Sequence, residues 1–263
     1  MQQNPQNFLT NLTDQQDLSK LCSSFEKDFG LKPCIGVEIE FYLENDDIAD
    51  APFVIKSEKG LHQYEIDLPS MTDMPLLIQE IENAKLALAL WRTSINFHPK
   101  PFSNDYGSAM HFHVNLLRAD GSNYFDDDDD NNNNIQTAAS SLCHFMRQTF
   151  LIFAPEESHY ARYDGRFMAP SHITYGGNNR SVAIRVPDAK PRRLEHRIAS
   201  PLTNPRDGIF VILKSIYLGL ANPSSIKHYP KIYGNAFDEQ YGAELLPRSL
   251  EEAMASWDRG FIG

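Results

Sequence analysis

The chain has few cysteines, no long apolar run and a shortage of positive charge. Its three cysteines, Cys22, Cys34 and Cys143, are an odd number without a CxxC pair, which excludes a disulfide framework and a zinc ribbon and indicates a reducing compartment. No apolar stretch reaches the roughly 18 residues of a membrane span, and the polar start after Met1 differs from a signal peptide. These absences predict a cytoplasmic protein that makes no membrane contact.

The charge balance is acidic. The 263 residues include 24 Lys and Arg against 35 Asp and Glu, for a net charge of -11, and the run 126–130 supplies five of the negative charges. Such a balance argues against binding to nucleic acid. The Asp- and Asn-rich segment 124–134 predicts a flexible, solvated loop. Elsewhere the chain shows no clear boundary, so we expect a single domain over residues 1–263.

Lysine is absent from four segments in which apolar and polar residues alternate: 35–43, 61–68, 110–116 and 193–198. Alternation predicts β-strands, and side chains two residues apart lie on the same face of a strand. For one such strand alone, a solvent-exposed polar face is the ordinary interpretation. In these segments, however, the polar positions hold acids and histidines: Glu38, Glu40, Glu65, His111, His113 and Glu195.

Several carboxylates on one face of a sheet would repel one another unless cations lie among them. Mg²⁺ and Mn²⁺ are hard cations that bind carboxylate oxygens, and Mn²⁺ also accepts imidazole. If the four strands belong to one sheet, the pattern therefore predicts a divalent-metal site on its polar face.

Helical patterns lie between and around these strands. Apolar spacing and capping residues predict helices over about 14–29, 73–94, 135–153 and 207–220, and a short last helix that Ser249 caps. Because helices and strands are intermixed, and the strands alternate instead of running as continuous Val and Ile, we expect an α+β fold. Its sheet should be mostly antiparallel, with one face packed on helices and the other open.

A second charged cluster is basic. Five cations lie within fourteen residues: Arg180, Arg185, Lys190, Arg192 and Arg193. Two interpretations are open. The cations form a solvated surface, or they lie beside the acidic sheet face and clamp a polyphosphate or an acidic substrate.

Six ordered segments resemble the catalytic domain of the glutamine synthetase family. They are GVEIEF at 36–41, QYEI at 63–66, PKPF at 99–102, GSAMHFH at 107–113, NRSVAIRVP at 179–187 and RRLEHR at 192–197. The resemblance implies that family's curved, mostly antiparallel sheet, the glutamine synthetase/guanido kinase fold. It also implies an ATP- and metal-dependent carboxylate–amine ligase, which activates a glutamate-like acid as an acyl phosphate for attack by an amine.

The resemblance implies a role for individual residues. One Mg²⁺ or Mn²⁺ ion would be held by Glu38, His111 and Glu195, and a second by Glu40 and Glu65. The phosphates of ATP would contact His113, Arg185, Lys190 and Arg193. The substrate carboxylate and the transferred phosphoryl group would be bound by Arg162, Arg180 and Arg197, with Gly107 against the substrate.

The chain also departs from the family pattern. No segment before residue 34 matches the family's small N-terminal β-domain. Ser57 occupies the place of a third carboxylate with Glu58 one position away, Met168 replaces a flap glutamate, and Tyr106 replaces an asparagine. We therefore expect a weakened second metal site. A homo-oligomer is left open, and a dodecamer is not expected.

Two alternatives to the ligase remain open. One is a catalytically degenerate relative that binds metal and nucleotide or amino acid as a sensor or partner. The replacement at Met168 and the unmatched β-domain favour it. The other is a sister ligase, such as a glutamate–cysteine ligase relative, which the segment 179–187 fits poorly.

Overall fold

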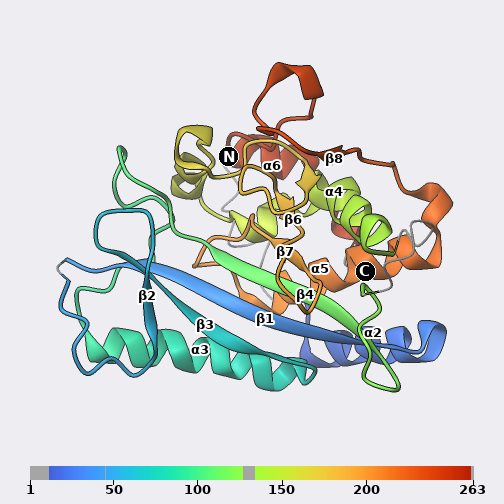
Figure 1. Ribbon diagram of the computed structural model, residues 1–263, viewed down its shortest axis with the longest axis horizontal. Coiled ribbons are helices and arrows are strands. Elements are labelled where there is room, and N and C mark those ends of the chain that lie inside the picture. The colour runs from blue at the N-terminus through green and yellow to red at the C-terminus, as the bar shows by residue number, and fades with distance from the viewer. Residues whose placement is uncertain (1–11, 45, 127–133, 262–263) are drawn as a thin grey trace.

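A single sheet forms the centre of the computed structural model, which describes residues 12–44, 46–126 and 134–261 (Figure 1). Its eight strands lie in the order β2-β3-β1-β4-β7-β6-β5-β8. They are β1 (Leu31–Tyr42), β2 (Ile55–Ser57), β3 (Gln63–Met71), β4 (Met110–Arg118), β5 (Tyr175–Gly176), β6 (Ile184–Arg185), β7 (Leu194–His196) and β8 (Lys231–Ile232). β5 pairs in parallel with β6 and β8, and the other pairs are antiparallel, which confirms the predicted mostly antiparallel sheet.

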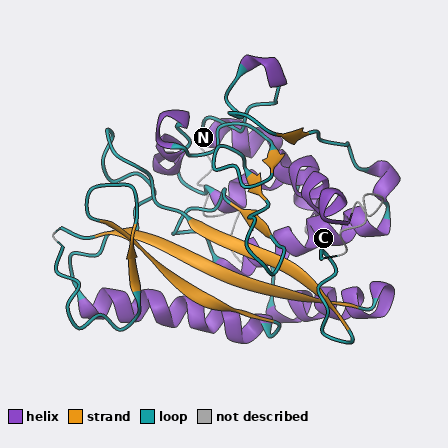
Figure 2. Ribbon diagram, viewed as in Figure 1, coloured by secondary structure: helices purple, strands orange, loops and turns teal. Residues whose placement is uncertain are grey.

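The helices pack on this sheet in two groups (Figure 2). The described α-helices are α2 (Gln15–Phe29), α3 (Met74–Trp91), α4 (Asn134–Phe153), α5 (Pro205–Ala221) and α6 (Leu250–Ser256). α2 and α3 run along the long strands, whereas α4, α5 and α6 gather beside the short strands. The side chains of Asp14, Asp73, Asn204 and Ser249 accept hydrogen bonds from first-turn backbone N–H groups and cap their helices.

The predicted helices are therefore confirmed, with shifted ends. α3 stops at Trp91 instead of about residue 94, because Arg92 leaves the helix in an extended conformation and its guanidinium bonds to Asp47 and to the carbonyl of Ala49. Four strands were not predicted: β2, β5, β6 and β8. Each has only two or three residues, too few for a period-2 pattern to be recognised.

The polar face of the long strands is largely covered in β1 and β4 and partly exposed in β3, which corrects the expectation of one open face. Ile35, Ile39 and Phe41 are fully buried in the apolar core beneath the sheet. On the opposite face Glu65 and Glu195 are only 6% and 2% exposed. The loops that carry the predicted arginines cover this polar face, so it lines a pocket instead of meeting bulk solvent.

Two further sequence expectations concern the loop 124–134 and membrane-spanning segments. Residues 127–133 of the predicted loop 124–134 lie outside the described residues. Among the helices that are described, none combines the length and the apolar character needed to cross a membrane.

Phe112 lies at the centre of the sheet, fully buried and opposite Val37 in β1 and His196 in β7. Phe112→Ala would leave a cavity, so we expect the free energy of unfolding to fall by about 3–5 kcal/mol in urea denaturation. Leu90→Ala is the matched control, because Leu90 is 77% exposed on α3. It should change stability by less than about 0.5 kcal/mol. Equal losses in the two variants would contradict this view of the core.

Candidate active site

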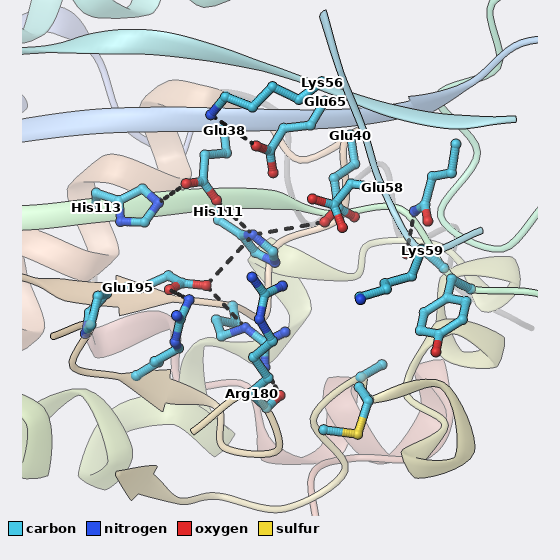
Figure 3. Close-up of a pocket in the computed structure, with 18 of the residues that line it drawn as sticks. Glu38, Glu40, Lys56, Glu58, Lys59, Glu65, His111, His113, Arg180 and Glu195 are labelled. Carbon is cyan, nitrogen blue, oxygen red and sulfur yellow. Dashed lines mark hydrogen bonds and ion pairs between the residues drawn. The ribbon is translucent and has the colours of Figure 1, made fainter. Parts of the chain in front are cut away.

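A pocket of about 440 Å³ lies between the polar sheet face and the loops around residues 162–169 and 178–197. That volume is in the range of small-molecule sites. Figure 3 shows Glu38 and Glu65 on the sheet side of the pocket and Arg180 on the opposite side. The pocket is therefore acidic along one wall and basic along the other.

Strand register brings the acids and histidines together. Glu40 in β1 lies opposite Glu65 in β3, and Glu38 lies opposite His111 in β4. In the next row, His113 lies opposite Glu195 in β7. Since residues two apart share a face, these antiparallel pairings place the predicted metal-binding side chains in adjacent rows.

His111 stands at the centre of this cluster. Its Nδ1 lies 3.2 Å from Glu38 Oε2, 3.8 Å from Glu195 Oε1 and 4.0 Å from Glu40 Oε1. Its other nitrogen, Nε2, is buried without a hydrogen-bond partner among the described residues. One imidazole thus faces carboxylates from both β1 and β7.

His113 is oriented by an arginine. Arg193 Nε donates a hydrogen bond to His113 Nδ1 at 3.1 Å, so the proton of a neutral imidazole lies on Nε2. That nitrogen is 2.8 Å from Glu38 Oε1. Arg193 and Glu38 therefore fix the ring from two sides.

Two arginines accompany Glu195. Arg185 Nη1 donates to Glu195 Oε2 at 2.6 Å, and Arg197 Nε lies 3.1 Å from Oε1. The backbone carbonyls of Arg180 and Val182 accept hydrogen bonds from Arg197 Nη1. The basic wall is thus tied both to the acidic wall and to its own backbone.

The two halves of the acidic wall differ in electrostatics, and the half nearest the histidines favours ionised acids. Burial alone would raise the pKa of Glu38, but its close pairing with His111 and His113 outweighs burial and holds that pKa below its ordinary value. Burial also opposes ionisation of Glu195, yet the charges of His111 and Arg197 lower its pKa. Both carboxylates are therefore ready to act as ligands.

In the other half, burial and neighbouring carboxylates oppose ionisation of the acids. Burial raises the pKa of Glu40, and burial together with the charges of Glu38 and Glu40 raises the pKa of Glu65 to about 9. Such shifts mean that a proton, or another cation, stabilises this group of acids.

The residues present fit a divalent ion. In each of two sets, the ligand atoms lie within 4.8 Å of one another. Both sets contain His111, one with Glu38 and Glu195 and the other with Glu40 and Glu65. Carboxylate oxygens with one imidazole nitrogen suit Mg²⁺ or Mn²⁺. These are the five residues that the sequence predicted as metal ligands, and their role as ligands stays a prediction.

Gly107 and Arg162 are in close contact. A Cβ at Gly107 would lie 2.7 Å from the carbonyl oxygen of Pro99 and 2.8 Å from Arg162 Cγ, so only glycine fits. The buried guanidinium of Arg162 donates to the carbonyls of Ile198 and Arg197, and its Nε has no partner among the described residues. Gly107 thus lets Arg162 reach the pocket wall.

The two remaining predicted site residues differ in their position relative to the pocket. Arg180 lines the pocket, whereas Lys190 does not. The Lys190 ammonium lies 3.1 Å from Asp126 Oδ1, and the Lys190 side chain is 60% exposed. The structure therefore brings together every predicted site residue except Lys190, whose contact with a nucleotide stays a prediction.

Three pocket residues that lie on or after β2 were not among the predicted site residues: Lys56, Glu58 and Lys59. Ser57 is paired with Tyr64, so its neighbours on either side face the pocket. The charge of Glu58 raises the pKa values of Glu40 and Glu65. Glu58 thus adds a carboxylate to the pocket one position after Ser57, and no local pattern in so short a strand could have placed it there.

A less polar wall closes the pocket near Met168. Tyr106, Phe167 and Met168 line it, and the rings of Tyr106 and Phe167 meet edge to face at 5.6 Å between centroids. Met168 has a φ of 57° and is 41% exposed, so a flexible thioether side chain sits in a left-handed turn at the pocket.

His196, between Glu195 and Arg197, lies on the other side of the sheet. It is 2% exposed, and its ring centroid is 4.5 Å from that of Phe153. Burial lowers its pKa to about 3, so the imidazole is neutral in the folded protein. It is a core residue and takes no part in the pocket.

Comparison with known proteins identifies the family. The family model described as "Glutamine synthetase, catalytic domain" matches residues 52–260, so the chain belongs to the glutamine synthetase family. This confirms the resemblance. The match begins after Glu38 and Glu40, and for those residues the placement comes from the sheet register described above.

Curated relatives are distant and longer than this chain. The gamma-glutamylputrescine synthetase PuuA of Escherichia coli K12 is 26% identical over 162 residues, which are 60% of this chain and 33% of PuuA. The glutamine synthetase of Pyrococcus furiosus is 26% identical over 219 residues, 79% of this chain and 49% of that enzyme. The chain thus spans about half the length, or less, of these relatives.

Solved structures confirm the fold. The structure described as the GmaS/ADP complex matches with a TM-score of 0.76 at 21% identity, and apo GmaS with a TM-score of 0.78 at 22% identity. The matches cover 94% of this chain and 69% and 68% of those chains, respectively. The predicted glutamine synthetase catalytic-domain fold is therefore correct.

The raised pKa of Glu65 predicts a pH-dependent stability in the absence of metal. A glutamate in the unfolded chain has a pKa of about 4.3, so between that value and 9 the folded protein keeps a proton on Glu65 that the unfolded chain has released. Raising the pH from about 7 to 9 should therefore lower the free energy of unfolding, by about 1–3 kcal/mol from this group.

Glu65→Gln should remove that component in denaturant titrations at both pH values. The difference between the two proteins isolates Glu65, because Lys85, whose pKa burial lowers to about 8, titrates in both. Identical pH profiles would show that Glu65 is ionised in the folded protein.

Proposed function

We propose that this protein is an ATP- and divalent-metal-dependent carboxylate–amine ligase of the glutamine synthetase type. The observation that carries the proposal is that an acidic wall and a basic wall face each other across one pocket. Glu38, Glu65 and His111 lie on the sheet side of the pocket, Arg180 lies on the opposite side, and Arg197 lines the same pocket beside Glu195. Membership of the family supports the same reaction.

In this reaction the side-chain carboxylate of a glutamate-like acid attacks the terminal phosphorus of ATP, and ADP leaves. The amine nitrogen then attacks the acyl carbon of the resulting acyl phosphate, an amide bond forms, and inorganic phosphate leaves after the nitrogen loses a proton. Both steps place negative charge on phosphoryl oxygens, so positioned cations are the main requirement.

The protein's own residues meet this requirement in two ways. Glu38, Glu40, Glu65, Glu195 and His111 would hold Mg²⁺ or Mn²⁺. When bound, such ions neutralise phosphate charge and orient the oxygens. Arg185 and Arg193, with His113, would hold the nucleotide phosphates, and Arg162, Arg180 and Arg197 the acid and the transferred group. Planar guanidinium groups suit both carboxylate and phosphate.

The less polar wall bears on the choice of amine. Tyr106, Phe167 and Met168 offer hydrocarbon, aromatic and thioether surface, which favours an amine that carries an alkyl group over ammonium alone. PuuA is named a gamma-glutamylputrescine synthetase, so a product built on an organic amine has a precedent among the relatives. We propose a primary alkylamine as the second substrate.

A binding protein without turnover is the second candidate. The observation that favours it is Met168, which lines the pocket where the family resemblance places an acid. A thioether cannot take a proton from the attacking amine. In that case the acidic and basic walls would bind metal and nucleotide or amino acid for sensing.

Product analysis distinguishes the two candidates. The protein is incubated with ATP, Mg²⁺ or Mn²⁺, glutamate and either ammonium or one of a series of primary alkylamines, and products are identified by mass spectrometry. The expected result is a γ-glutamylalkylamide together with ADP, with little glutamine. Nucleotide binding without ADP formation would support the sensor. Glutamine made with a kcat of about 10 s⁻¹ would contradict the proposed amine.

Met168→Glu should raise turnover with ammonium, because a carboxylate at this position can accept a proton from the attacking nitrogen. A gain of about tenfold or more is expected, at the low end of general-base effects. Met168→Gln is the control of equal size without a titratable group and should give no gain. Equal rates in both variants would show that position 168 does not act on the amine.

A further inference from the structure

One lysine lies on the acidic wall of the pocket. Lys56 in β2 is opposite Glu65 in β3, and its Nζ is 3.6 Å from Glu65 Oε1. The same ammonium donates a hydrogen bond to Asp67 Oδ2. Figure 3 shows the Lys56 side chain running along the wall, with its ammonium beside Glu38 and Glu65.

This ammonium lies where three carboxylates converge. Glu38 and Asp67 are opposite each other in β1 and β3, and ligand oxygens of Glu38, Glu65 and Asp67 lie within 4.8 Å of one another. Three acids so close together need positive charge among them. Lys56 supplies part of it from within the chain.

Glu65 belongs to two groups of acids at once. It lies with Lys56 and Asp67 on the outer side, and with Glu40 and His111 on the inner side. The group around Glu195 is different, because Arg185 and Arg197 accompany it and no lysine of the described part of the chain is paired with it. Among the described residues that line the pocket, the Glu65 group is therefore the one in which a lysine ammonium is paired with the acids.

We propose that Lys56 is a built-in cation that competes with the second divalent ion for Glu65. The proposal rests on the metal-binding wall of the proposed function and adds a residue that sets how many ions it holds. The ion held by Glu38, His111 and Glu195 is bound tightly, and the ion at Glu40 and Glu65 is bound weakly.

The ion pairs of Lys56 with Glu65 and Asp67 can be broken when a divalent ion binds. The side chains of Lys56 and Asp67 are 51% and 44% exposed, whereas that of Glu65 is 8% exposed. An exposed ion pair is weak and its lysine is free to swing into solvent. A divalent ion at sufficient concentration therefore displaces the ammonium and is not permanently excluded.

The test is a Mn²⁺ titration of the whole chain, without nucleotide, followed by calorimetry and by the electron paramagnetic resonance of free Mn²⁺. The wild-type protein should bind one ion tightly and a second weakly. Lys56→Gln should leave the first ion unchanged and tighten the second by about tenfold, since a positive charge a few ångströms away is removed. Lys56→Arg, which keeps the charge, should leave the second ion weak.

Lys59→Gln is the matched control. Lys59 lines the same pocket and carries the same charge, but it follows β2 and is not opposite Glu65 in the sheet. It should tighten the second ion by less than about twofold, as expected of a more distant charge. Equal tightening in Lys56→Gln and Lys59→Gln, or no tightening in Lys56→Gln, would overturn the proposal.

Failure of the proposed function gives a different result. Glu38→Gln should weaken the tight ion, so wild-type protein that binds no Mn²⁺, or an unchanged tight ion in Glu38→Gln, would contradict the metal-binding wall itself. Thermal melting of each variant without metal shows whether it is folded. If Lys56→Gln does not fold, Lys56→Met is titrated in its place, with the same outcomes.

Discussion

Repulsion among closely spaced carboxylates is the constraint on which the pocket depends. The pairing of β3, β1 and β4 sets Glu65, Glu40 and Glu38 in adjacent rows, where burial removes the water that would screen them. Positively charged groups near the acidic wall offset this repulsion. His111 and His113 favour ionised Glu38, and Arg185 and Arg197 favour ionised Glu195. The arrangement is therefore one in which bound cations and the fold stabilise each other.

Much of this architecture could be predicted from the sequence, because the long strands alternate strictly. Glu38 and Glu40 fall two residues apart, as do His111 and His113, and this spacing alone places each pair on one face of its strand. Helix ends were predictable for a similar local reason, since Asp73 and Ser249 cap through hydrogen bonds to residues three positions away.

What could not be predicted depends on short strands and on distant contacts. β2 has three residues, so the side on which Lys56 and Glu58 lie follows from its pairing with β3 and not from its own pattern. The burial of the polar face also came from elsewhere, namely from the loops around residues 162–169 and 178–197, which are distant in sequence from β1, β3 and β4. Lys190 shows the converse: its place among the basic residues in the sequence does not bring it into the pocket.

The alternation of polar and apolar contacts at the end of β7 has a consequence for the register of this strand during folding. Glu195 and Arg197 lie on the pocket side, while the neutral ring of His196 packs against Phe153 in the core. A slip of one residue would exchange these sides and place a carboxylate and a guanidinium against apolar side chains. Because an unpaired buried charge is far costlier than a lost apolar contact, misregistered forms of this short strand are strongly disfavoured. The ionisable groups of the pocket thus also favour the native strand register while the sheet assembles.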